Sequence, residues 1–581
     1  MNHIQLAIGQ ARALISGAYE AAANAGELPR IELRPVQIEI PKDLRNGDYA
    51  SGFAMQNAKA LGMPPRKAAE ILLSHMELSG SCFSAVEIAG PGFLNLRLAH
   101  SWFENVLRDI VAEGKDYGCT QAEKKEKVMV EFVSANPTGP MHMGNARGGV
   151  LGDCLAEVLF RAGNDVTREF YVNDAGNQID KFATSIDARY RQLILGEDAV
   201  EFPENGYHGN DIRELARLFR EENGDTWLEK AESERHAAMA DFGLKHNLPA
   251  MRADLEKYLI HYDVWFFEST LHESGFVADT VKQLTDKGWT YEKDGALWLK
   301  TSALLHEMYV KEGKTEEEIE KLELKDDVLR RANGFYTYFA ADIAYHRNKL
   351  EIRGFDRVIN IWGADHHGHV ARLKCALDAL GLDGSHRLEI VLMQLVQLVR
   401  DGQPVRMSKR TGNAIALRDL LDEVSVDAAR FFFNSRAATS PIEFDLGLAV
   451  QQNSDNPVYY VQYAHARIHS IFRKLEIADP AACSATPAQL ALLTAPEERE
   501  LIRHLSGLEK TVVECAKALD PSGITRYALE LATLFHKFYN ACHVSGVDAD
   551  LAAARLALCD ATRIALRNVL TMMKIDAPES M

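Results

Sequence analysis

The spacing of apolar side chains divides the first part of the chain into a helix, strands and a charged connection. Apolar residues recur at helical spacing over 4–14 and predict an opening helix. They alternate with polar residues over 36–40 and 93–98, which predicts two strands. The segment 119–127 is charged and has no apolar face, which is typical of a linker. These patterns predict a compact α+β domain over residues 1–118.

A strand–turn–helix–strand pattern follows the linker. Residues 127–134 alternate as a strand does, and a turn rich in glycine and proline comes after them. Apolar side chains then repeat at helical spacing over 151–159, and Gly163 marks the end of the helix. Residues 167–172 alternate again as a second strand. This βαβ unit predicts a parallel sheet.

The rest of the chain predicts helical insertions, further strands and a helical C-terminal domain. Residues 180–330 are charged and mostly helical in pattern, so we expect helices inserted between two halves of the sheet. Apolar runs at 357–363 and 387–399 predict a return to strands, and the pattern then becomes helical to the end. We therefore expect an α/β multidomain fold, with a Rossmann-like parallel-sheet domain over 119–449 and an all-helical domain over 450–581.

Composition narrows the class of protein without identifying a partner. Apolar residues make up 47% and charged residues 25% of the chain, which is typical of soluble globular proteins. The net charge of −18, from 65 basic and 83 acidic residues, does not indicate a nucleic-acid partner, although a local basic stripe can still bind phosphates. No apolar run reaches the roughly 18 residues of a membrane helix, and the N-terminus lacks the basic and apolar regions of a signal peptide.

The cysteines indicate a reducing compartment. Eight cysteines lie at long, irregular spacings, and none forms a CxxC pair. This pattern favours free thiols in the cytoplasm over disulfides. A structural zinc site is the weaker alternative, and we expect no metal site built by the protein.

The turn after the 127–134 strand has the residue types of a phosphate site. It lies at a predicted helix N-terminus, where unpaired N–H groups and the helix dipole favour an anion. Glycines allow close approach to the backbone, while His142 and Asn145 can donate hydrogen bonds to phosphate oxygens. The chain has neither the P-loop pattern nor the GxGxxG dinucleotide pattern. The spacing resembles the HIGH element of class I aminoacyl-tRNA synthetases and related nucleotidyl transferases, and it covers Asn136, Pro137, Thr138, Gly139, Pro140, Met141, His142, Met143, Gly144, Asn145 and Ala146.

A second basic segment, GQPVRMSKRTGN at 402–413, resembles the KMSKS loop of the same class. Arg406 stands in place of the first Lys, Lys409 matches the second Lys, and Arg410 replaces the final Ser. Three cations within five residues can neutralise charge that develops on a triphosphate. Either segment alone is compatible with an ordinary turn, whereas the two in this order indicate adenylate chemistry.

The ordered blocks narrow the resemblance to arginyl-tRNA synthetases. The blocks are VEFVSANPTGPMHMGNARGGVLGD, YVNDAGNQI, YFAADIAYHRNK, WGADHHGHVARLKCAL, MSKRTGN, FDLGLA, NPVYYVQYAHARI and the C-terminal DAPESM. AGPGFLNLRL near the N-terminus resembles the tRNA-contacting domain of that family. The chain departs from the family's usual pattern at Asn145, where a His is commoner.

The resemblance implies ATP-dependent activation of L-arginine to arginyl-adenylate and its transfer to the 3′ end of tRNA(Arg), with ATP entering as its Mg²⁺ complex. It implies that activation depends on bound tRNA, and that the protein is a cytoplasmic monomer without membrane association. In the same terms, 119–449 corresponds to a class I catalytic domain and 450–581 to a DALR-type anticodon-binding domain.

The same resemblance assigns residues to each substrate. It implies that Glu131 and Asn136 fix the α-amino end of arginine. It implies that Tyr338 and Asp342, one helical turn apart, hold the guanidinium. The catalytic residues are His142, Asn145, Arg406 and Lys409. The ATP-binding residues are His142, Gly144, Asn145, Gly363, Asp365, His366, Met407, Ser408 and Lys409. The tRNA-binding residues are Phe93, Asn95, Tyr459, Tyr463 and Arg467.

Alternatives stay open for some of these residues and for the function. The segment 362–369 has the residue types of metal ligands, although the lack of a second cluster favours contacts to ribose and adenine. Glu131 also fits a solvent-facing strand edge, and the aromatic residues at 456–468 also fit a helical core. A pantothenate synthetase-like adenylate former would be shorter and lack the C-terminal helices. A non-catalytic RNA-binding paralogue is favoured only by Asn145, and a cysteine-specific synthetase is disfavoured because no cysteine cluster offers zinc ligands.

Overall fold

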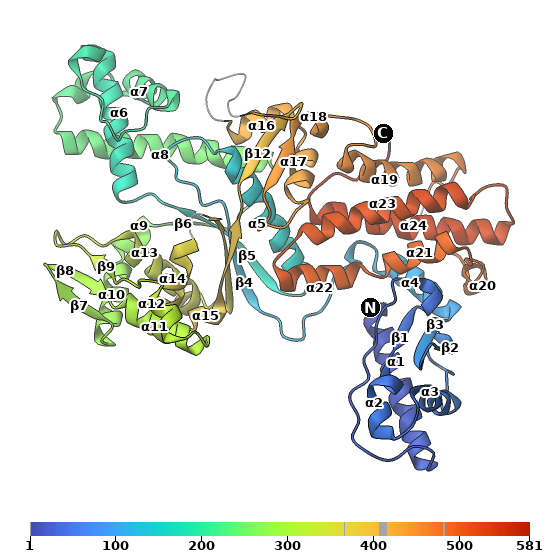
Figure 1. Ribbon diagram of the computed structural model, residues 1–581. Helices are drawn as coiled ribbons and strands as arrows, with labels where there is room; N and C mark the ends of the chain where they lie inside the picture. The colour runs from blue at the N-terminus through green and yellow to red at the C-terminus, as the bar shows by residue number, and fades with distance from the viewer. Residues whose placement is uncertain (1, 365–366, 406–414, 480–482) are drawn as a thin grey trace.

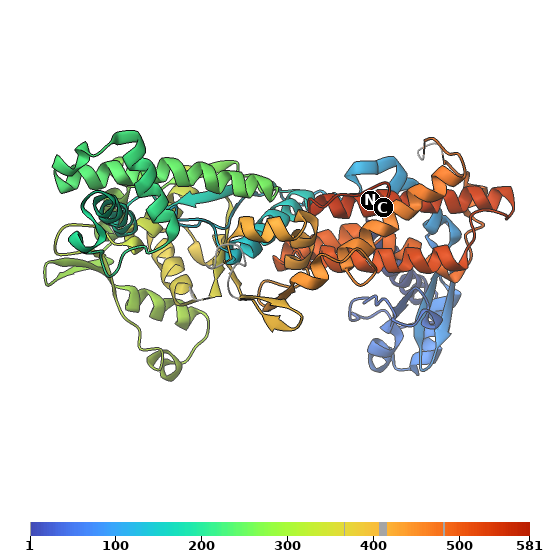
Figure 2. The same cartoon turned by 90° about the horizontal axis from the view of Figure 1, so that it is seen from above.

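The computed structural model describes residues 2–364, 367–405, 415–479 and 483–581. Figure 1 shows a central sheet with inserted helices and strands on one side, and with the C-terminal helices and the N-terminal unit on the other. The view from above in Figure 2 shows the same separation. In the described part of the chain, no helix combines the length and the apolar composition that crossing a membrane requires. The α+β, parallel-sheet and all-helical parts occur in the expected order and confirm the predicted fold class.

The N-terminal unit packs helices against an antiparallel sheet of order β1–β3–β2. Its elements are α1 (His3–Asn24), β1 (Tyr49–Ser51), α2 (Phe53–Leu61), α3 (Pro65–Ser74), β2 (Phe83–Ala89), β3 (Phe93–Leu98) and α4 (His100–Glu113). The prediction of a strand over 36–40 is wrong, since the segment forms only an isolated bridge between Glu39 and Ala50. Pro35 and Pro41 flank the segment, and proline has no N–H to donate to a ladder.

Parallel strands in the order β11–β10–β4–β5–β6 form the central sheet. The strands are β4 (Lys127–Glu131), β5 (Asp165–Val172), β6 (Val264–Phe267), β10 (Arg357–Gly363) and β11 (Leu388–Met393). The helix α5 (Met143–Arg161) connects β4 to β5, which confirms the predicted βαβ unit. Because β4 is the middle strand, the turn at its carboxyl end opens at the centre of the sheet, where open parallel folds bind ligands.

Glycines in α5 allow this helix to lie close to the chain that leaves β4 and to the chain that leaves α8 (Glu232–Lys257). A Cβ atom added to Gly152 would stand 2.1 Å from Cγ of Phe132, and one added to Gly149 would stand 2.6 Å from Cδ1 of Ile260. Both distances are far inside the van der Waals contact distance of two carbon atoms. The missing side chains therefore set the spacing between helix and sheet, and with it the position of the helix N-terminus.

The inserted segment 180–330 is only partly helical. Helices α6 (Asn177–Leu195), α7 (Asn210–Asn223) and α8 (Glu232–Lys257) pack around their own core and agree with the prediction. Residues 264–267 instead form β6 of the central sheet. A separate antiparallel sheet of β7 (Thr290–Lys293), β8 (Ala296–Leu299) and β9 (Asp327–Arg330) lies among α9 (Ser269–Glu273), α10 (Phe276–Asp286), α11 (Thr301–Lys311) and α12 (Glu316–Glu320). Each of these strands has four residues, which is too short for an alternating pattern to stand out.

A helix that changes its winding leads back to the central sheet. α13 (Tyr338–Arg347) continues into a π-helical turn, Asn348–Ile352. The predicted strand over 357–363 is β10, whereas the run over 387–399 is two strands. β11 belongs to the central sheet, but β12 (Val396–Arg400) pairs with β13 (Gln403–Pro404) and β14 (Ile442–Asp445). The helices of this region are α14 (His367–Leu380), α15 (Gly384–Arg387), α16 (Leu417–Glu423), α17 (Val426–Phe433) and α18 (Leu446–Ala449).

The C-terminal part is helical, as predicted. Its helices are α19 (Pro457–Lys474), α20 (Pro487–Leu490), α21 (Pro496–Leu505), α22 (Leu508–Ala518), α23 (Ser522–Ala541) and α24 (Ala549–Met572). Arg503 of α21 forms an ion pair with Asp48 of the N-terminal unit at 2.5 Å. Arg430 of α17 is fully buried and joins Asp153 of α5 to the main-chain carbonyl of Met573. The C-terminal helices are thus tied both to the N-terminal unit and to α5.

Candidate active site

The N-terminus of α5 forms one wall of a cavity of about 740 Å³. The residues of the sequence-based assignment that line it are Asn136, Thr138, Gly139, Pro140, His142, Gly144, Asn145 and Gly363. Asp211 of the inserted helix α7 lines it as well, opposite Gly139, and burial raises the pKa of its carboxyl. Sequence reasoning missed Asp211, because nothing in the pattern of α7 distinguishes it from a solvated acid. The structure therefore brings the HMGN turn and the end of β10 to one cavity.

His142 and Asn145 build the cap of α5. His142 is the N-cap residue, and its main-chain N–H donates to Oδ1 of Asn145 at 3.0 Å. The Asn145 oxygen is thereby used inside the turn, so its amide nitrogen is the atom that can donate to a ligand. Asn at this position completes the helix cap without a cationic side chain.

The chain that follows the basic segment is paired with the same turn. His142 and Ala416 form an isolated bridge, and the N–H of Leu417 donates to the carbonyl of Met141 at 2.9 Å. The residues of the RMSKR segment that were assigned to catalysis and ATP, Arg406, Met407, Ser408 and Lys409, lie outside the described residues. Residues 415–417 are therefore anchored at the N-terminus of α5.

A buried arginine of α5 contacts the main chain both before and after the basic segment. Arg147 donates to the main-chain carbonyls of Gln394, Ala437 and Ser440 at 2.8–2.9 Å. Its guanidinium is fully buried, and burial lowers its pKa to about 10. Because Gln394 lies between β11 and β12, this contact fixes the path from the central sheet towards the basic segment.

The backbone between β4 and the HMGN turn is strained. Val133 and Ser134 have positive φ values of 68° and 42°. A β-branched residue in this region is unfavourable by about 1–3 kcal/mol and persists only where other contacts hold it. The Ser134 hydroxyl provides such contacts, since it donates to Oε1 of Glu131 at 2.9 Å and accepts the N–H of Tyr171 at 3.1 Å. Sequence reasoning missed Ser134, because a serine after a strand is common in turns.

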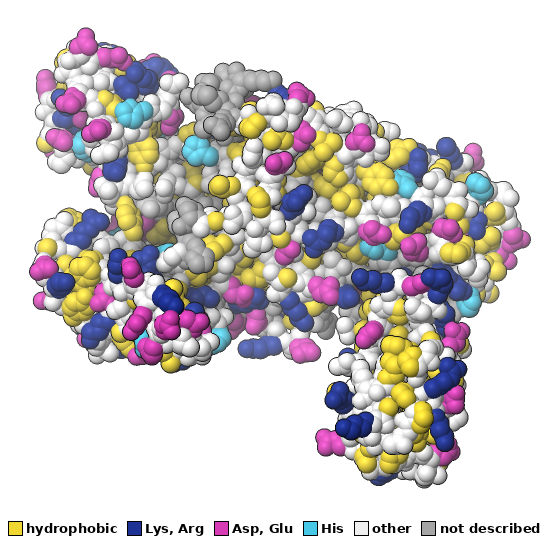
Figure 3. Space-filling view, in the orientation of Figure 1, with side chains coloured by type: hydrophobic (Ala, Val, Ile, Leu, Met, Phe, Trp, Pro, Cys, Tyr) yellow, Lys and Arg dark blue, Asp and Glu magenta, His cyan; other side chains and the backbone are white. Residues whose placement is uncertain are grey.

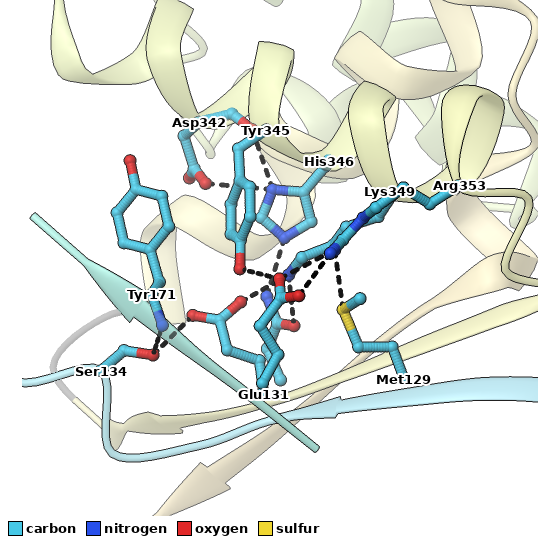
Figure 4. Close-up of polar contacts among 11 residues, drawn as sticks. Met129, Glu131, Ser134, Tyr171, Asp342, Tyr345, His346, Lys349 and Arg353 are labelled. Carbon is cyan, nitrogen blue, oxygen red and sulfur yellow. Dashed lines mark hydrogen bonds and ion pairs between the residues drawn. The ribbon is translucent and has the colours of Figure 1, made fainter. Parts of the chain in front are cut away.

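Glu131 belongs to a polar row across three neighbouring strands (Figure 4). Its partners in the β10 and β5 ladders are Asn360 and Glu169, and all three residues are buried. Nζ of Lys349 lies 2.5 Å from Oε2 of Glu131, and two nitrogens of Arg353 lie 2.5 and 2.9 Å from the Glu169 carboxylate. Glu131 is thus neither at a sheet edge nor in solvent, but forms half of a buried ion pair.

Asp342 faces this cluster from α13 (Figure 4). Its Oδ1 lies 3.0 Å from Nδ1 of His346, and its Oδ2 lies 2.5 Å from Nε2 of His369. Burial alone would raise the pKa of the carboxyl, but the two imidazoles outweigh it and hold the pKa below its usual value. A quarter of the side chain, 25%, stays exposed, so α13 presents an ionised carboxylate.

Tyr338 begins α13 one turn before Asp342, and 45% of it is exposed. A Cβ atom added to Gly176 would stand 3.6 Å from the Tyr338 hydroxyl, and burial raises the pKa of that hydroxyl. Gln178, on the same segment as Gly176, lines the cavity at α5. Tyr338 therefore lies beside a part of the cavity wall.

Residues of the segment 362–369 lie both at the cavity and beside Asp342. Gly363 lines the cavity, and His369 contacts Asp342. Asp365 and His366, which were assigned to ATP, lie outside the described residues. Among the residues that are described, no group of three or more His, Cys, Asp or Glu side chains could hold a metal ion.

Half-buried aromatic side chains form a row on α19. The rings of Tyr459 and Tyr463 are stacked, with centroids 6.2 Å apart and planes 11° from parallel. The guanidinium of Arg467 lies over the rings of Tyr463 and Tyr539, 4.7 and 4.8 Å from their centroids. Arg467 also donates to the Tyr463 hydroxyl at 2.9 Å. The row combines partly exposed rings with a cation, which is the combination that single-stranded bases stack on.

The two residues assigned to RNA in β3 differ in exposure. Phe93 is half-buried, whereas Asn95 is buried, with 4% exposed. The burial of Asn95 favours a structural role in the sheet. Acidic and basic side chains are interspersed over the visible face of the N-terminal unit and the C-terminal helices (Figure 3), so contacts to phosphates there depend on individual cations.

Three family models match the chain one after the other. The model for the arginyl tRNA synthetase N terminal domain matches residues 9–98. The model for the catalytic domain of class I (R) tRNA synthetases matches 106–439, and that for the DALR anticodon binding domain matches 461–581. The matched segments coincide with the α+β, parallel-sheet and helical parts of the structure.

Individual proteins agree with the family models. The arginine–tRNA ligases of Acetivibrio thermocellus and Caldanaerobacter subterraneus are each 50% identical to the chain, over 98% and 100% of both proteins respectively. The structure of a putative arginyl tRNA synthetase from Campylobacter jejuni has a TM-score of 0.73 at 33% identity, over 83% of this chain and 100% of that one. Thermus thermophilus arginyl-tRNA synthetase has a TM-score of 0.70 at 22% identity, over 98% and 100%, and shares the fold.

Proposed function

The chain belongs to the arginyl-tRNA synthetase family, and from this premise we infer that it is an arginine–tRNA ligase. In the first step an oxygen of the arginine carboxylate attacks the α-phosphorus of ATP, and pyrophosphate leaves. In the second step a hydroxyl of the 3′-terminal adenosine of tRNA(Arg) attacks the carbonyl carbon of arginyl-adenylate. That hydroxyl loses its proton, and AMP leaves. Neither step needs a covalent intermediate on the protein.

The N-terminus of α5 and the RMSKR segment stabilise the phosphate charge. His142 and the amide nitrogen of Asn145 donate to phosphate oxygens, and Arg406 and Lys409 bring cations to them. ATP arrives as its Mg²⁺ complex. Losing one such preorganised donor typically costs ~3–4 kcal/mol, a factor of about 10² to 10³ in rate. The pairing of His142 with Ala416 supports this assignment, because it brings the chain that follows the RMSKR segment to the wall of the cavity.

Arginine binds between α13 and the turn after β4. The ionised carboxylate of Asp342 and the hydroxyl of Tyr338 hold the guanidinium, which favours planar carboxylate partners. Asn136 and Glu131 receive the α-amino group. Glu131 already accepts from Lys349 and Ser134, but a carboxylate has acceptor positions for about four donors, so it can accept an ammonium as well. Gly363, Asp365 and His366 contact the adenosine of ATP.

The domains before and after the catalytic domain bind tRNA. Residues 1–118 form the domain that contacts tRNA through Phe93, residues 119–449 form the catalytic domain, and residues 450–581 bind the anticodon on the row of Tyr459, Tyr463 and Arg467. The protein acts as a monomer in the cytoplasm, in keeping with its eight free cysteines.

Charging of total tRNA with each labelled amino acid tests the assignment. We expect incorporation of arginine alone, and incorporation of any other amino acid would contradict the proposed specificity. Pyrophosphate exchange should be small without tRNA and large with it. Exchange of full magnitude in tRNA-free enzyme would contradict the proposed dependence on tRNA.

Substitution of the basic segment tests the phosphate assignment separately. Lys409→Ala should abolish most of the charging activity while leaving the fold intact, because it removes a cation that is proposed to stabilise the phosphate charge. Near-wild-type charging by this variant would refute the role of RMSKR while leaving the specificity for arginine untouched.

A further inference from the structure

We propose that Lys349 is a positioning residue that aligns the two carboxylates of the arginine site, Glu131 directly and Asp342 through Asn360 and His346. The inference rests on the proposed role of Asp342 in arginine binding. It concerns a series of contacts on one face of the sheet, which runs from Glu131 through Lys349 and Asn360 to His346 and Asp342 on α13 (Figure 4).

Lys349 occupies a site where an ammonium ion requires partners. Its side chain has 0% exposure, and Nζ lies 2.5 Å from Oε2 of Glu131, 3.3 Å from Oδ1 of Asn360 and 3.9 Å from the centre of the Tyr345 ring. A buried charge is costly unless it is paired and hydrogen-bonded. The π-helical turn Asn348–Ile352 carries the residue, and such turns are frequent at functional sites.

The register of the sheet places the two acceptors of Lys349 side by side. Asn360 on β10 is the direct ladder partner of Glu131 on β4, so both side chains leave the same face of the sheet. The ammonium therefore bridges two strands that are separated in sequence by the whole inserted region. A single cation fixes the position of both acceptors relative to α13.

The direction of each hydrogen bond between Lys349 and Asp342 follows from the ammonium group of Lys349. An ammonium can only donate, so the Asn360 atom that faces it is the oxygen, and the Asn360 amide nitrogen must point the other way. That nitrogen lies 2.7 Å from Nε2 of His346. Because the amide nitrogen also can only donate, Nε2 of His346 accepts, and the imidazole proton is on Nδ1.

The proton on Nδ1 of His346 points at Asp342. Nδ1 lies 2.8 Å from the main-chain carbonyl and 3.0 Å from Oδ1 of that residue, and both atoms are acceptors. Oδ2 accepts from His369 on the other side. The carboxylate is thus held by one donor on each oxygen, and its remaining lone pairs keep a fixed direction for a guanidinium. Without Lys349, nothing fixes the orientation of the Asn360 amide. The tautomer of His346, and with it the donor to Oδ1 of Asp342, is then no longer fixed.

Asn360→Asp is the sharpest test, because it exchanges a single NH₂ group for an oxygen. The new carboxylate can still accept from Lys349, but it can no longer donate to His346. Between two carboxylates the imidazole takes up a second proton and donates from both nitrogens, so a positive charge then lies beside Asp342 and repels the guanidinium of the substrate. We expect the KM for arginine in tRNA charging to rise about tenfold to a hundredfold, which is the range for a weakened hydrogen bond to a charged group, while the KM for ATP changes little.

Asn434→Asp is the matched control. Asn434 is also buried, and its amide donates to Thr525 and Pro521 at the contact with the C-terminal helices. This variant makes the same chemical change away from the proposed arginine site, so a loss of stability alone should not separate the KM for arginine from the KM for ATP. If both variants raise the two constants together, the effect of Asn360→Asp is structural and the inference fails.

Asn360→Ala keeps the test decisive if Asn360→Asp does not fold. It removes the amide without adding a buried charge and should also raise the KM for arginine selectively, with a smaller factor. An unchanged KM for arginine in a folded Asn360 variant would overturn the role of Lys349. Failure of the wild-type protein to charge tRNA with arginine would instead overturn the proposed function, so the two failures are distinguishable.

Discussion

The Nε2 atom of His369 lies 2.5 Å from Oδ2 of Asp342, and through this contact the helix after β10 supports the carboxylate on α13. Gly363, at the end of β10, lines the cavity at the N-terminus of α5. One short segment therefore reaches both the proposed adenosine side and the proposed guanidinium side of the site. His369 itself has an acidic partner in Asp342, so its presence is accounted for without a metal ion.

Asp342→Asn should lower kcat/KM for arginine by roughly 10² to 10³, because a charge-assisted bond to the guanidinium is replaced by a neutral one. The loss should fall mainly on the KM for arginine in steady-state charging. Asp326→Asn is a suitable control, since Asp326 bonds Ser302 and Tyr291 and does not line the cavity. Equal effects of the two substitutions on the KM for arginine would refute the assignment of Asp342.

Gly152→Ala should destabilise the protein by about 1–3 kcal/mol, as overpacked cores do. The added Cβ atom would meet Phe132 at 2.1 Å, so α5 or β4 must shift. Gly17→Ala is the matched control, because Gly17 lies in α1 with open space around it and should gain about 0.5–1 kcal/mol in helix propensity. Denaturant unfolding measures both changes. A stability of Gly152→Ala equal to that of the wild type would show that the two elements are not closely packed.

The sequence predicts best those features of the site that depend on residues close together in the chain. The HMGN turn, the helix after it and the residues that cap that helix are neighbours in the chain, so the residue types and their spacing predict the wall of the cavity. The two acids assigned to the arginine site lie on the predicted elements, Glu131 at the end of a strand and Asp342 on a helix. Their partners were not predicted. Glu131 was expected to fix the α-amino end of arginine, and its ion pair with Lys349 was not expected.

The pairing of Glu131 could not be predicted, because it depends on which strands are neighbours. Asn360 comes beside Glu131 only through the β10–β4 register, and a single sequence carries no signal for that register. One signal was used only in part. The helical spacing of Tyr338 and Asp342 was noted, but Tyr345 and Lys349 continue the same helical face, which predicts a polar face turned towards other polar groups.

The predictions that failed concern short or interrupted strands. The segment 36–40 alternates correctly, but prolines at both ends prevent it from joining a ladder. The strand 264–267 has four residues and lies between helices, so its apolar side chains looked helical. The run 387–399 is continuous in sequence, yet it passes from one sheet to another between β11 and β12.

Tyr463→Ala should raise the KM for tRNA(Arg) about tenfold and leave the KM for arginine unchanged, because a base that stacks on an aromatic ring gains about 1–3 kcal/mol. Tyr463→Phe is the control, since it keeps the ring and removes only the hydroxyl that accepts from Arg467. Charging kinetics at varied tRNA concentration compare the two. If the phenylalanine variant loses as much as the alanine variant, the hydroxyl and not the ring surface is what matters.

Acidification should destabilise the C-terminal helices through His465. This side chain is buried, with 2% exposed, and Nδ1 lies 2.9 Å from the main-chain carbonyl of Pro578. Burial lowers the pKa of His465 from 6.5 to about 4, and the cations Arg563 and Arg567 act in the same direction. Between these two pH values the His465 imidazole is protonated in the unfolded chain but not in the folded chain. Stability therefore falls as the pH falls through this window, by an amount on the order of 3 kcal/mol.

His465→Gln removes this titration and should flatten the pH dependence. A glutamine amide can still donate to the carbonyl of Pro578, so the variant keeps a partner for that group. Denaturant unfolding between about pH 7 and about pH 4 should give a smaller slope of the free energy of unfolding for His465→Gln than for the wild type. His306→Gln, at a side chain that is 44% exposed, should keep the wild-type slope. Parallel curves for His465→Gln and the wild type would mean that the buried imidazole is protonated as readily in the folded state as in the unfolded chain.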